Sequence, residues 1–161
     1  MSLSLVLVLA GIAILVWVGL KYATPGGSPI VPDDPLWIAA VERARATIPE
    51  MLEHQRQGRE VWVKFPVPTG SGRNEHVWGR ITELQGELLQ CTIETPPASP
   101  ASREALGVTE IPATEIEDWQ VELEDRSIRG GFTTRAQAEI ARRDRQKVPP
   151  HVEDMIRRMT D

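Results

Sequence analysis

The chain has 161 residues, a formal net charge of −5 and 13 prolines. That length accommodates one ordinary domain with an accessory segment, and it excludes two full domains. A single cysteine excludes a disulfide framework and a cysteine-cluster metal site. Three scattered histidines and 5% aromatic residues leave little material for a metal or haem centre, so we expect no cofactor and no metal.

The first predicted element is a membrane anchor. Residues 3–20 carry no charged side chain, and a helix of that length spans roughly 27 Å, close to the ~30 Å hydrocarbon core of a bilayer. Trp17 and Tyr22 lie near its far end, where aromatic rings prefer the headgroup level. The alternative is a cleaved secretory signal, but no Lys or Arg precedes the apolar run and no small-residue cleavage site follows it. We therefore expect residues 1–22 to stay in the lipid bilayer, which residues 3–20 contact.

The orientation of the anchor is predicted from the nearest basic residues. Lys21 follows the apolar run, whereas the short N-terminal tail offers only its amine. Because basic residues favour the cytoplasmic side, the following domain is expected in the cytoplasm rather than in the periplasm. The unpaired Cys91 is compatible with either compartment.

Residues 23–34 are a predicted stalk, since their prolines and glycines prevent a regular element. A helix then begins, with Asp34 as N-cap and Pro35 at its first position. Pro49 is expected to kink or restart this helix, and Gly58 to end it. Its apolar face recurs at three- and four-residue steps and comprises Trp37, Val41, Ala44, Ile48 and Met51.

From Glu60 onward the hydrophobic pattern has a period of two residues, which is typical of strands. In the first of these segments Trp62 and Lys64 alternate with apolar residues. Several short, hairpin-linked strands behind a helix indicate an α+β domain with a strongly bent antiparallel sheet, open-barrel-like and flanked by helices. The predicted strands are residues 61–65, 75–84, 89–93, 108–112, 119–123 and 127–132.

A second helix is expected after the Gly130-Gly131 pair, over residues 135–147, with Thr133 or Thr134 as its cap. Prolines break it, and a last short helix carries the apolar stripe Val152, Met155, Ile156 and Met159. We expect this stripe to dock on the domain itself, with a groove on a partner as the alternative. The predicted organisation is an anchor (1–22), a stalk (23–34), an α+β domain (35–137) and a C-terminal helical tail (138–161).

Charge is unevenly distributed along the chain. Residues 48–126 carry 15 acidic and 7 basic side chains, a net −8, whereas residues 127–161 carry 8 basic and 5 acidic side chains, a net +3. The acidic body lacks the basic face that nucleic acids require, so we expect no nucleic-acid partner. The basic cluster is expected to be a solvated helix face, with contact to an anionic membrane leaflet as the alternative; it comprises Arg142, Arg143, Arg145 and Lys147.

Five segments occur in a recognisable order and spacing: AAVERARATIPEML, VKF, EHVWGRI, IEDWQVE and IRGGFTTR. Through them residues 34–137 resemble the YegJ-like bacterial family, domain of unknown function 2314. The resemblance implies a bacterial protein of unsettled biochemical role, so the membrane that holds the predicted anchor is expected to be the bacterial inner membrane. The chain departs from the family in its third strand, where family members have a glycine and then an Asn-x-Pro turn, whereas this chain has LQCT and then ETP at residues 94–96. The matching positions form the candidate functional surface: Glu75, His76, Trp78, Asp118, Trp119, Gly130, Gly131 and Thr133.

His76 and Trp78 are expected on one face of their strand and Glu75 on the other. Acid–base chemistry at His76 requires a partner that orients its ring, and Asp118 is the one attractive candidate. In the alternative, His76 is a hydrogen-bonded structural residue and Asp118 accepts backbone N–H bonds in a turn. We expect this structural alternative.

Three further features have a functional and a structural interpretation. The three indoles of Trp62, Trp78 and Trp119 either line a groove for an extended peptide or fill core volume. The Gly130-Gly131 pair before a helix suggests a phosphate site, but it lacks the residues of a Walker or dinucleotide loop, so a tight turn is expected. Cys91 is expected to be a small apolar core residue.

The function expected from these features is a membrane-tethered, non-catalytic binding module that recognises a protein partner near the inner membrane. The first alternative is a hydrolase or ligand-binding enzyme that uses Glu75, His76 and Asp118. The second is a structural subunit of a larger membrane complex.

Overall fold

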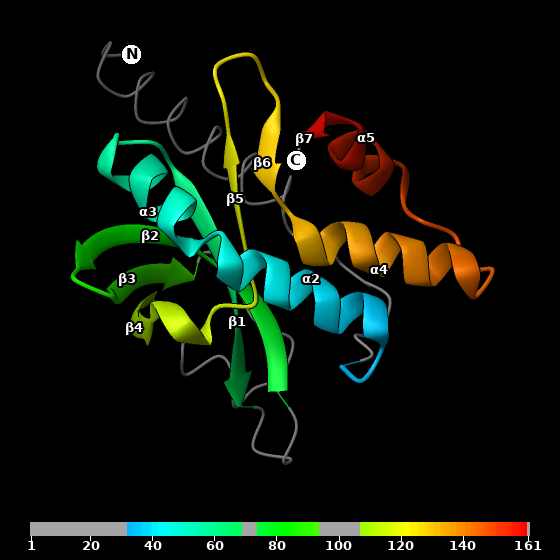
Figure 1. Ribbon diagram of the computed structural model, residues 1–161, viewed down its shortest axis with the longest axis horizontal. Helices are drawn as coiled ribbons and strands as arrows, with labels where there is room; N and C mark the ends of the chain where they lie inside the picture. The colour runs from blue at the N-terminus through cyan, green and yellow to red at the C-terminus, as the bar shows by residue number, and fades with distance from the viewer. Residues whose placement is uncertain (1–31, 69–73, 94–106, 161) are drawn as a thin grey trace, which may run out of the picture.

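The computed structural model describes residues 32–68, 74–93 and 107–160 (Figure 1). Within these ranges no helix is both long and apolar enough to cross a membrane. The predicted anchor and most of the predicted stalk lie outside the described residues. The elements in chain order are α2 (Pro35–Ala46), α3 (Ile48–Arg56), β1 (Val61–Pro68), β2 (Asn74–Gln85), β3 (Leu88–Ile93), β4 (Gly107–Pro112), the 3-10 turn η2 (Ala113–Glu115), β5 (Asp118–Glu122), β6 (Ile128–Gly130), α4 (Phe132–Arg143), α5 (Pro150–Arg158) and β7 (Met159–Thr160).

In the described ranges, seven strands form one sheet in the order β4-β3-β2-β1-β5-β6-β7. Neighbouring strands are antiparallel except β6 and β7, which run parallel. The predicted α+β class is confirmed. The prediction of a purely antiparallel sheet is wrong, because the chain returns through α5 before it adds β7 at the edge. The sheet is open, since its outer strands β4 and β7 do not pair with each other.

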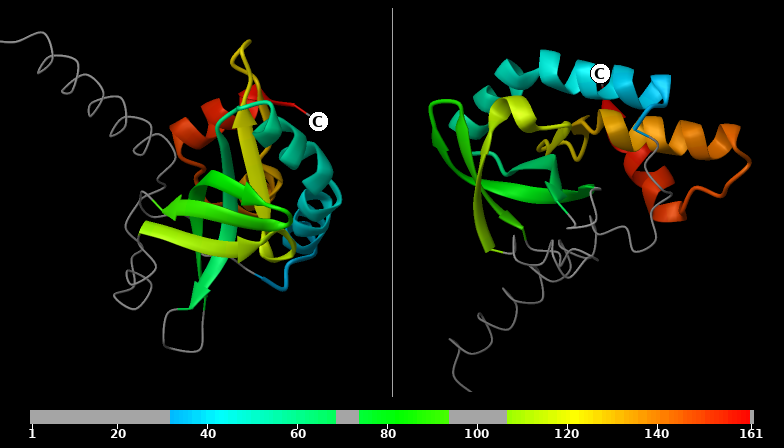
Figure 2. Two further views of the ribbon diagram at one scale, coloured as in Figure 1. Left: turned by 90° about the vertical axis from the view of Figure 1, so that its left-hand side faces the viewer. Right: turned by 90° about the horizontal axis from the view of Figure 1, so that it is seen from below.

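The sheet bends at β2, its longest strand. The register of β2 against β3 shifts between Ile81 and Glu83, and an irregularity of this kind bends a strand and increases its twist. Helices α2 and α3 lie along one side of the curved sheet, and α4 packs beside α2 (Figure 2). The bend therefore wraps the sheet around a core that the helices cover.

The N-terminal helical region begins where the sequence predicts and divides into two helices. Asp34 accepts a backbone hydrogen bond from the first turn at 3.0 Å, and Pro35 occupies the first position. At the end of α2 the Thr47 hydroxyl donates to carbonyls of the preceding turn. Because proline is tolerated in the first turn of a helix and not in its interior, the chain restarts at Ile48-Pro49 as α3.

The core lies between these helices and the inner face of the sheet. Strand β1 contributes Val61, Val63 and Phe65, all at most 2% exposed. Trp119 stands opposite Val63 on β5 and is fully buried. Cys91 belongs to the same core, and burial raises the pKa of its thiol to about 12, so it is a small apolar core residue, as predicted.

The C-terminal part packs on the domain itself. Helix α4 starts at Phe132, three residues before the predicted start, and α5 packs against it. The apolar stripe of the last helix faces the domain, with Val152 8% exposed and Met155 and Ile156 half-buried. The expectation that this stripe docks on its own domain is therefore confirmed.

The turn from β6 into α4 yields a first testable prediction. Gly130 has a φ of +84°, and a Cβ at this position would overlap the backbone carbonyl of Trp119. We expect Gly130→Ala to lower the free energy of unfolding by about 3 kcal/mol or more, because left-handed strain adds to an overlap with backbone that no rotamer relieves. The control Gly86→Ala has a φ of +65° and no atom within 4 Å, so it should cost only about 1–2 kcal/mol. Urea unfolding measures both, and equal losses would contradict the overlap.

Candidate functional site

A buried lysine lies at the centre of the sheet. Lys64 of β1 stands opposite Trp78 of β2 and Asp118 of β5, and it is 4% exposed. Its Nζ donates to Thr133 Oγ1 at 3.4 Å and to Gln137 Oε1 at 3.3 Å, both on α4. Ordinary N–H···O bonds extend to about 3.2 Å. These two longer bonds therefore compensate only in part for the hydrogen bonds to water that the ammonium group loses on burial.

Two tryptophan rings enclose the same ammonium group. Lys64 Nζ lies 4.7 Å from the ring centroid of Trp37 and 5.9 Å from that of Trp78, within the range of cation–π attraction. Burial lowers the pKa of Lys64 to about 8, and the negative charges of Asp118 and Glu117 oppose this shift. The charged form of Lys64 therefore costs the folded state free energy despite its neighbours.

Asp118 is fully buried beside Lys64 and holds the start of α4. Its Oδ1 accepts the backbone N–H groups of Trp119 at 2.8 Å and Phe132 at 3.0 Å. Its Oδ2 accepts the N–H of Thr133 at 2.8 Å and the hydroxyl of the same residue at 2.6 Å. Burial raises the pKa of Asp118, while the hydrogen bonds from Thr133 and the charge of Lys64 oppose the rise. Asp118 thus caps α4 from a neighbouring strand, in line with the expected structural role.

The same contacts answer two expectations about the start of α4. The prediction that Thr133 or Thr134 caps the helix is wrong, because Thr133 lies inside the first turn and donates its hydroxyl to Asp118. An anion site at the Gly130-Gly131 turn would use backbone N–H groups that already donate hydrogen bonds to the Asp118 carboxylate. The pair is a tight turn, as expected, with both residues at positive φ.

The acidic partner of His76 is Glu117, not Asp118. His76 Nδ1 and Glu117 Oε2 form a short hydrogen bond, and their side chains are 12% and 14% exposed. The His76 ring lies edge-on to Trp37, with 5.8 Å between the ring centroids. Because four donors already surround Asp118, the proposed pairing of His76 with Asp118 is not formed.

The other predicted site residues do not gather at this point. Glu75 and His76 are neighbours on β2 and point to opposite faces of the sheet. Of the two interpretations of Trp62, Trp78 and Trp119, the aromatic groove is not formed, because Trp62 is 5% exposed and Trp119 is fully buried. Trp78 is half-buried. One indole of the three thus reaches solvent to an appreciable extent.

Four residues outside the predicted site complete this arrangement: Trp37, Lys64, Glu117 and Gln137. Lys64 does carry a signal, since it is the one charge within the apolar strand VWVKFPVP. The other three carry none, because their contacts depend on which helix and which loop cover the strand. We call the whole set the Lys64 cluster: Trp37, Lys64, His76, Trp78, Glu117, Asp118, Thr133 and Gln137.

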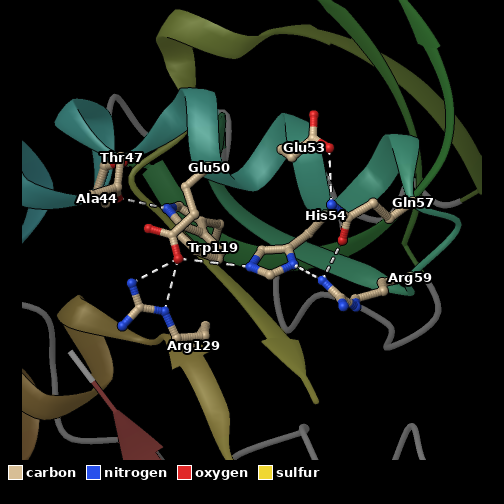
Figure 3. Close-up of polar contacts among 9 residues, drawn as sticks. All are labelled: Ala44, Thr47, Glu50, Glu53, His54, Gln57, Arg59, Trp119 and Arg129. Carbon is tan, nitrogen blue, oxygen red and sulfur yellow. Dashed lines mark hydrogen bonds and ion pairs between the residues drawn. The ribbon is translucent and has the colours of Figure 1, made fainter. Parts of the chain in front are cut away.

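A second polar cluster joins α3 to β6 (Figure 3). Glu50 Oε1 accepts a hydrogen bond from Arg129 Nε at 2.8 Å and forms an ion pair with Nη2 of the same residue at 2.7 Å. His54 Nδ1 lies 2.6 Å from Arg59 Nη1; since arginine only donates, this ring nitrogen is the acceptor and carries no proton. His54 Nε2 is 3.7 Å from Glu50 Oε1, and the imidazole packs on Trp119 with 6.0 Å between centroids. His54 is therefore held in its neutral form.

The environment of His54 predicts that the free energy of unfolding falls in acid. Burial first, and then the charge of Arg59, lowers the pKa of His54, and Glu50 opposes the shift. The folded state thus binds fewer protons than the unfolded chain, so this contribution to stability is lost as the pH falls from 6.5 through the lowered pKa. We expect His54→Asn, whose side-chain oxygen still accepts from Arg59, to flatten the fall in the free energy of unfolding between pH 7 and pH 5. Urea unfolding across this range tests it, and an unchanged slope would contradict it.

The histidines of the two clusters are bound to protein groups. His54 is engaged by Arg59, and His76 by Glu117. In the part of the chain that the structure describes, no three His, Cys, Asp or Glu side chains are placed to hold a metal ion.

Fold and site together define an α+β domain with an open, curved sheet, in which buried charged residues join the sheet to the helices. The chain belongs to the family described as an uncharacterized protein conserved in bacteria, domain of unknown function 2314, which matches residues 34–149. The resemblance expected from the five sequence segments is confirmed at this level. Comparison with curated proteins and with solved structures gave no match.

Proposed function

We propose that this protein is a YegJ-like, membrane-tethered, non-catalytic binding module that recognises a protein partner near the bacterial inner membrane. The proposed contact surface is the Trp78 patch, which consists of His76, Trp78 and Glu117. The observation that carries the proposal is how this patch is supported. Trp78 lies over the buried Lys64 ammonium, and His76 is held between Glu117 and the ring of Trp37.

A supported patch of this kind favours recognition. Tryptophan side chains are enriched among the residues that dominate binding energy at protein interfaces, because they bury a large apolar area. Side chains that are already held in place lose little conformational entropy when a partner binds. The hydrogen-bonded His76–Glu117 pair beside the indole adds polar groups of defined position, which contribute specificity.

The arrangement of the polar groups weighs against the enzymatic alternative. A hydrolase built on Glu75, His76 and Asp118 requires these three side chains to converge on one reacting atom. Glu75 lies on the opposite face of β2, and both oxygens of Asp118 accept hydrogen bonds from the start of α4. We therefore favour binding over catalysis.

The tether and the location rest on the sequence. Residues 3–20 are the proposed contact with the lipid bilayer, and Lys21 favours a domain on the cytoplasmic side of the inner membrane. The acidic body argues against nucleic acid as the partner. The structural-subunit alternative would need an apolar face for the complex, and the stripe of the last helix already packs on the domain itself.

Site-specific photocrosslinking in native membranes tests the proposal. A photoreactive phenylalanine derivative replaces Trp78 in the full chain, and the matched control carries it in place of the exposed Glu124. We expect a discrete protein adduct from position 78 and none from position 124. Identical adduct patterns at both positions would refute the patch. Loss of the chain from membranes on alkaline washing would refute the tether, and substrate turnover abolished by His76→Ala would establish the enzymatic alternative.

A further inference from the structure

The edge of β6 and the turn that follows it form an acceptor for the C-terminal end of the described chain. We call residues 150–160, which comprise α5 and β7, the latch. In the parallel β6–β7 pair Met159 stands beside Ile128, which is 1% exposed, and Thr160 stands beside Arg129. The Met159 thioether fills the space above Gly131, where a Cβ would overlap it. Gly131 therefore works as a socket for one latch side chain.

Polar contacts on both sides of the socket bind further residues of the latch. Arg158 Nε donates to the carbonyl of Arg126 at 2.7 Å, and its Nη2 donates to Glu122. Nearer the start of α5, Glu153 accepts a hydrogen bond from Arg142 of α4. Successive latch residues thus supply a charge, an apolar side chain and a strand partner.

The acceptor and the latch are separable parts of the chain. The acceptor residues lie within the family match, residues 34–149, whereas the latch lies beyond it. Exposed residues 144–147, followed by Val148 and Pro149, connect the parts. In this connecting segment Arg145 has a φ of +57°. This left-handed conformation is energetically unfavourable for any residue that carries a Cβ atom. A straighter connection would relieve that strain and would leave every contact between acceptor and latch available.

From these observations we propose that the latch exchanges between two copies of this chain, so that Met159 of each copy fills the Gly131 socket of the other. The contacts at the acceptor are identical in the closed monomer and in the exchanged pair, so only the connection and the association entropy distinguish the two states. Attachment of both copies to one membrane would raise their effective concentration, but the exchange does not depend on the proposed binding function.

Disulfide trapping between differently labelled copies tests the exchange. One batch of the full chain carries Arg129→Cys and the other carries Thr160→Cys, the two positions that pair across β6 and β7. The batches are mixed in mild detergent and oxidised; the native thiol of Cys91 is fully buried and does not interfere. Exchange predicts a covalent dimer that contains one chain of each batch, which a closed latch cannot form. The matched control replaces Arg129→Cys with Glu87→Cys in the exposed turn between β2 and β3.

A dimer yield no higher than that of the Glu87→Cys control would overturn the proposal. Because Arg129→Cys also removes the bond to Glu50, a second measurement uses chains without added cysteines. Light scattering should show a dimer fraction for the unmodified chain and its loss in Met159→Asp, since an ionised carboxylate cannot occupy the Gly131 socket. A dimer fraction that Met159→Asp leaves unchanged, or an unmodified chain that is monomeric at every concentration, would equally refute it.

Discussion

Replacing Lys64 with methionine should stabilise the protein at neutral pH, by about 2 kcal/mol, because the lowered pKa of Lys64 already includes its attraction to Asp118. Burial lowers the pKa of Lys64 from 10.5 to about 8, which corresponds to a folding cost of about 3 kcal/mol for the charged form. Methionine has a similar volume, fills the space between the Trp37 and Trp78 rings and carries no charge to desolvate. Loss of the two long hydrogen bonds to Thr133 and Gln137 offsets about 1 kcal/mol of that gain.

The pH dependence of this stabilisation has a defined sign. The folded state binds fewer protons than the unfolded chain between the lowered pKa of about 8 and 10.5. The contribution of Lys64 to stability is therefore fully present above 10.5 and is lost as the pH falls to about 8. The advantage of Lys64→Met should accordingly be constant below pH 8 and shrink as the pH rises further.

Urea unfolding at pH 7 and at pH 9.5 measures the effect. The exposed Lys147→Met is the matched control and should change the free energy of unfolding by less than about 0.5 kcal/mol. If Lys64→Met were instead less stable than the unmodified chain at pH 7, the ammonium group would be a net stabiliser through Asp118, and the interpretation of its burial as a cost would be wrong.

Replacing Asp118 with alanine should have the largest destabilising effect, about 3–5 kcal/mol. The substitution removes the acceptor of four hydrogen bonds and leaves the N–H groups at the start of α4 without their cap. It also leaves the buried Lys64 ammonium without the negative neighbour that raises its pKa most. Because Asp118 joins β5 to α4, the loss should affect the whole domain rather than one helix end.

A double-mutant cycle separates the two causes. In a Lys64→Met background no ammonium is left unpaired, so Asp118→Ala should cost less, and the difference reports the coupling of the two charges. Asp125→Ala is the matched control: this exposed aspartate also accepts from a backbone N–H and a hydroxyl, both of Ser127, and its loss should lower the free energy of unfolding far less than Asp118→Ala does. Equal costs for Asp118→Ala and Asp125→Ala, measured by urea unfolding, would contradict the capping role.

The cost assigned to Lys64 bears on the proposed function. A charged residue that destabilises the fold is informative because a hydrophobic residue of similar size would serve the core better. Lys64 instead places a positive charge behind the half-buried Trp78 and near Glu117. Loss of the photocrosslinked adduct in Lys64→Met, with stability raised, would link the buried charge directly to recognition.

Much of the secondary structure follows from local features of the sequence. The Asp34-Pro35 pair starts α2, and the period of two in residues 61–65 produces β1, because capping and side-chain alternation act over a few residues. The same local reasoning misses the parallel strand β7. Two residues, Met159 and Thr160, have no strand signal of their own and pair only because α5 delivers them to the edge of β6.

The candidate site was predictable only in part, for a related reason. The sequence identified His76, Trp78, Asp118 and Thr133 as residues of interest, yet it assigned Asp118 to the wrong partner. The Lys64–Thr133 contact joins residues 69 positions apart, and the His76–Glu117 contact joins residues 41 positions apart. No spacing pattern predicts which of two adjacent acids, Glu117 or Asp118, turns toward the histidine.

The sequence by itself determined the composition limits, the family, the α+β class and the positions of most helices and strands, because these depend on residue type and short-range periodicity. The tertiary structure alone decided that Asp118 caps α4, that Lys64 is enclosed by two indoles and that Glu117 is the partner of His76. Each of these results depends on how the sheet curves and where α2 and α4 cross it. That geometry is a property of the whole packed core, in which burial and hydrogen-bond satisfaction are met together.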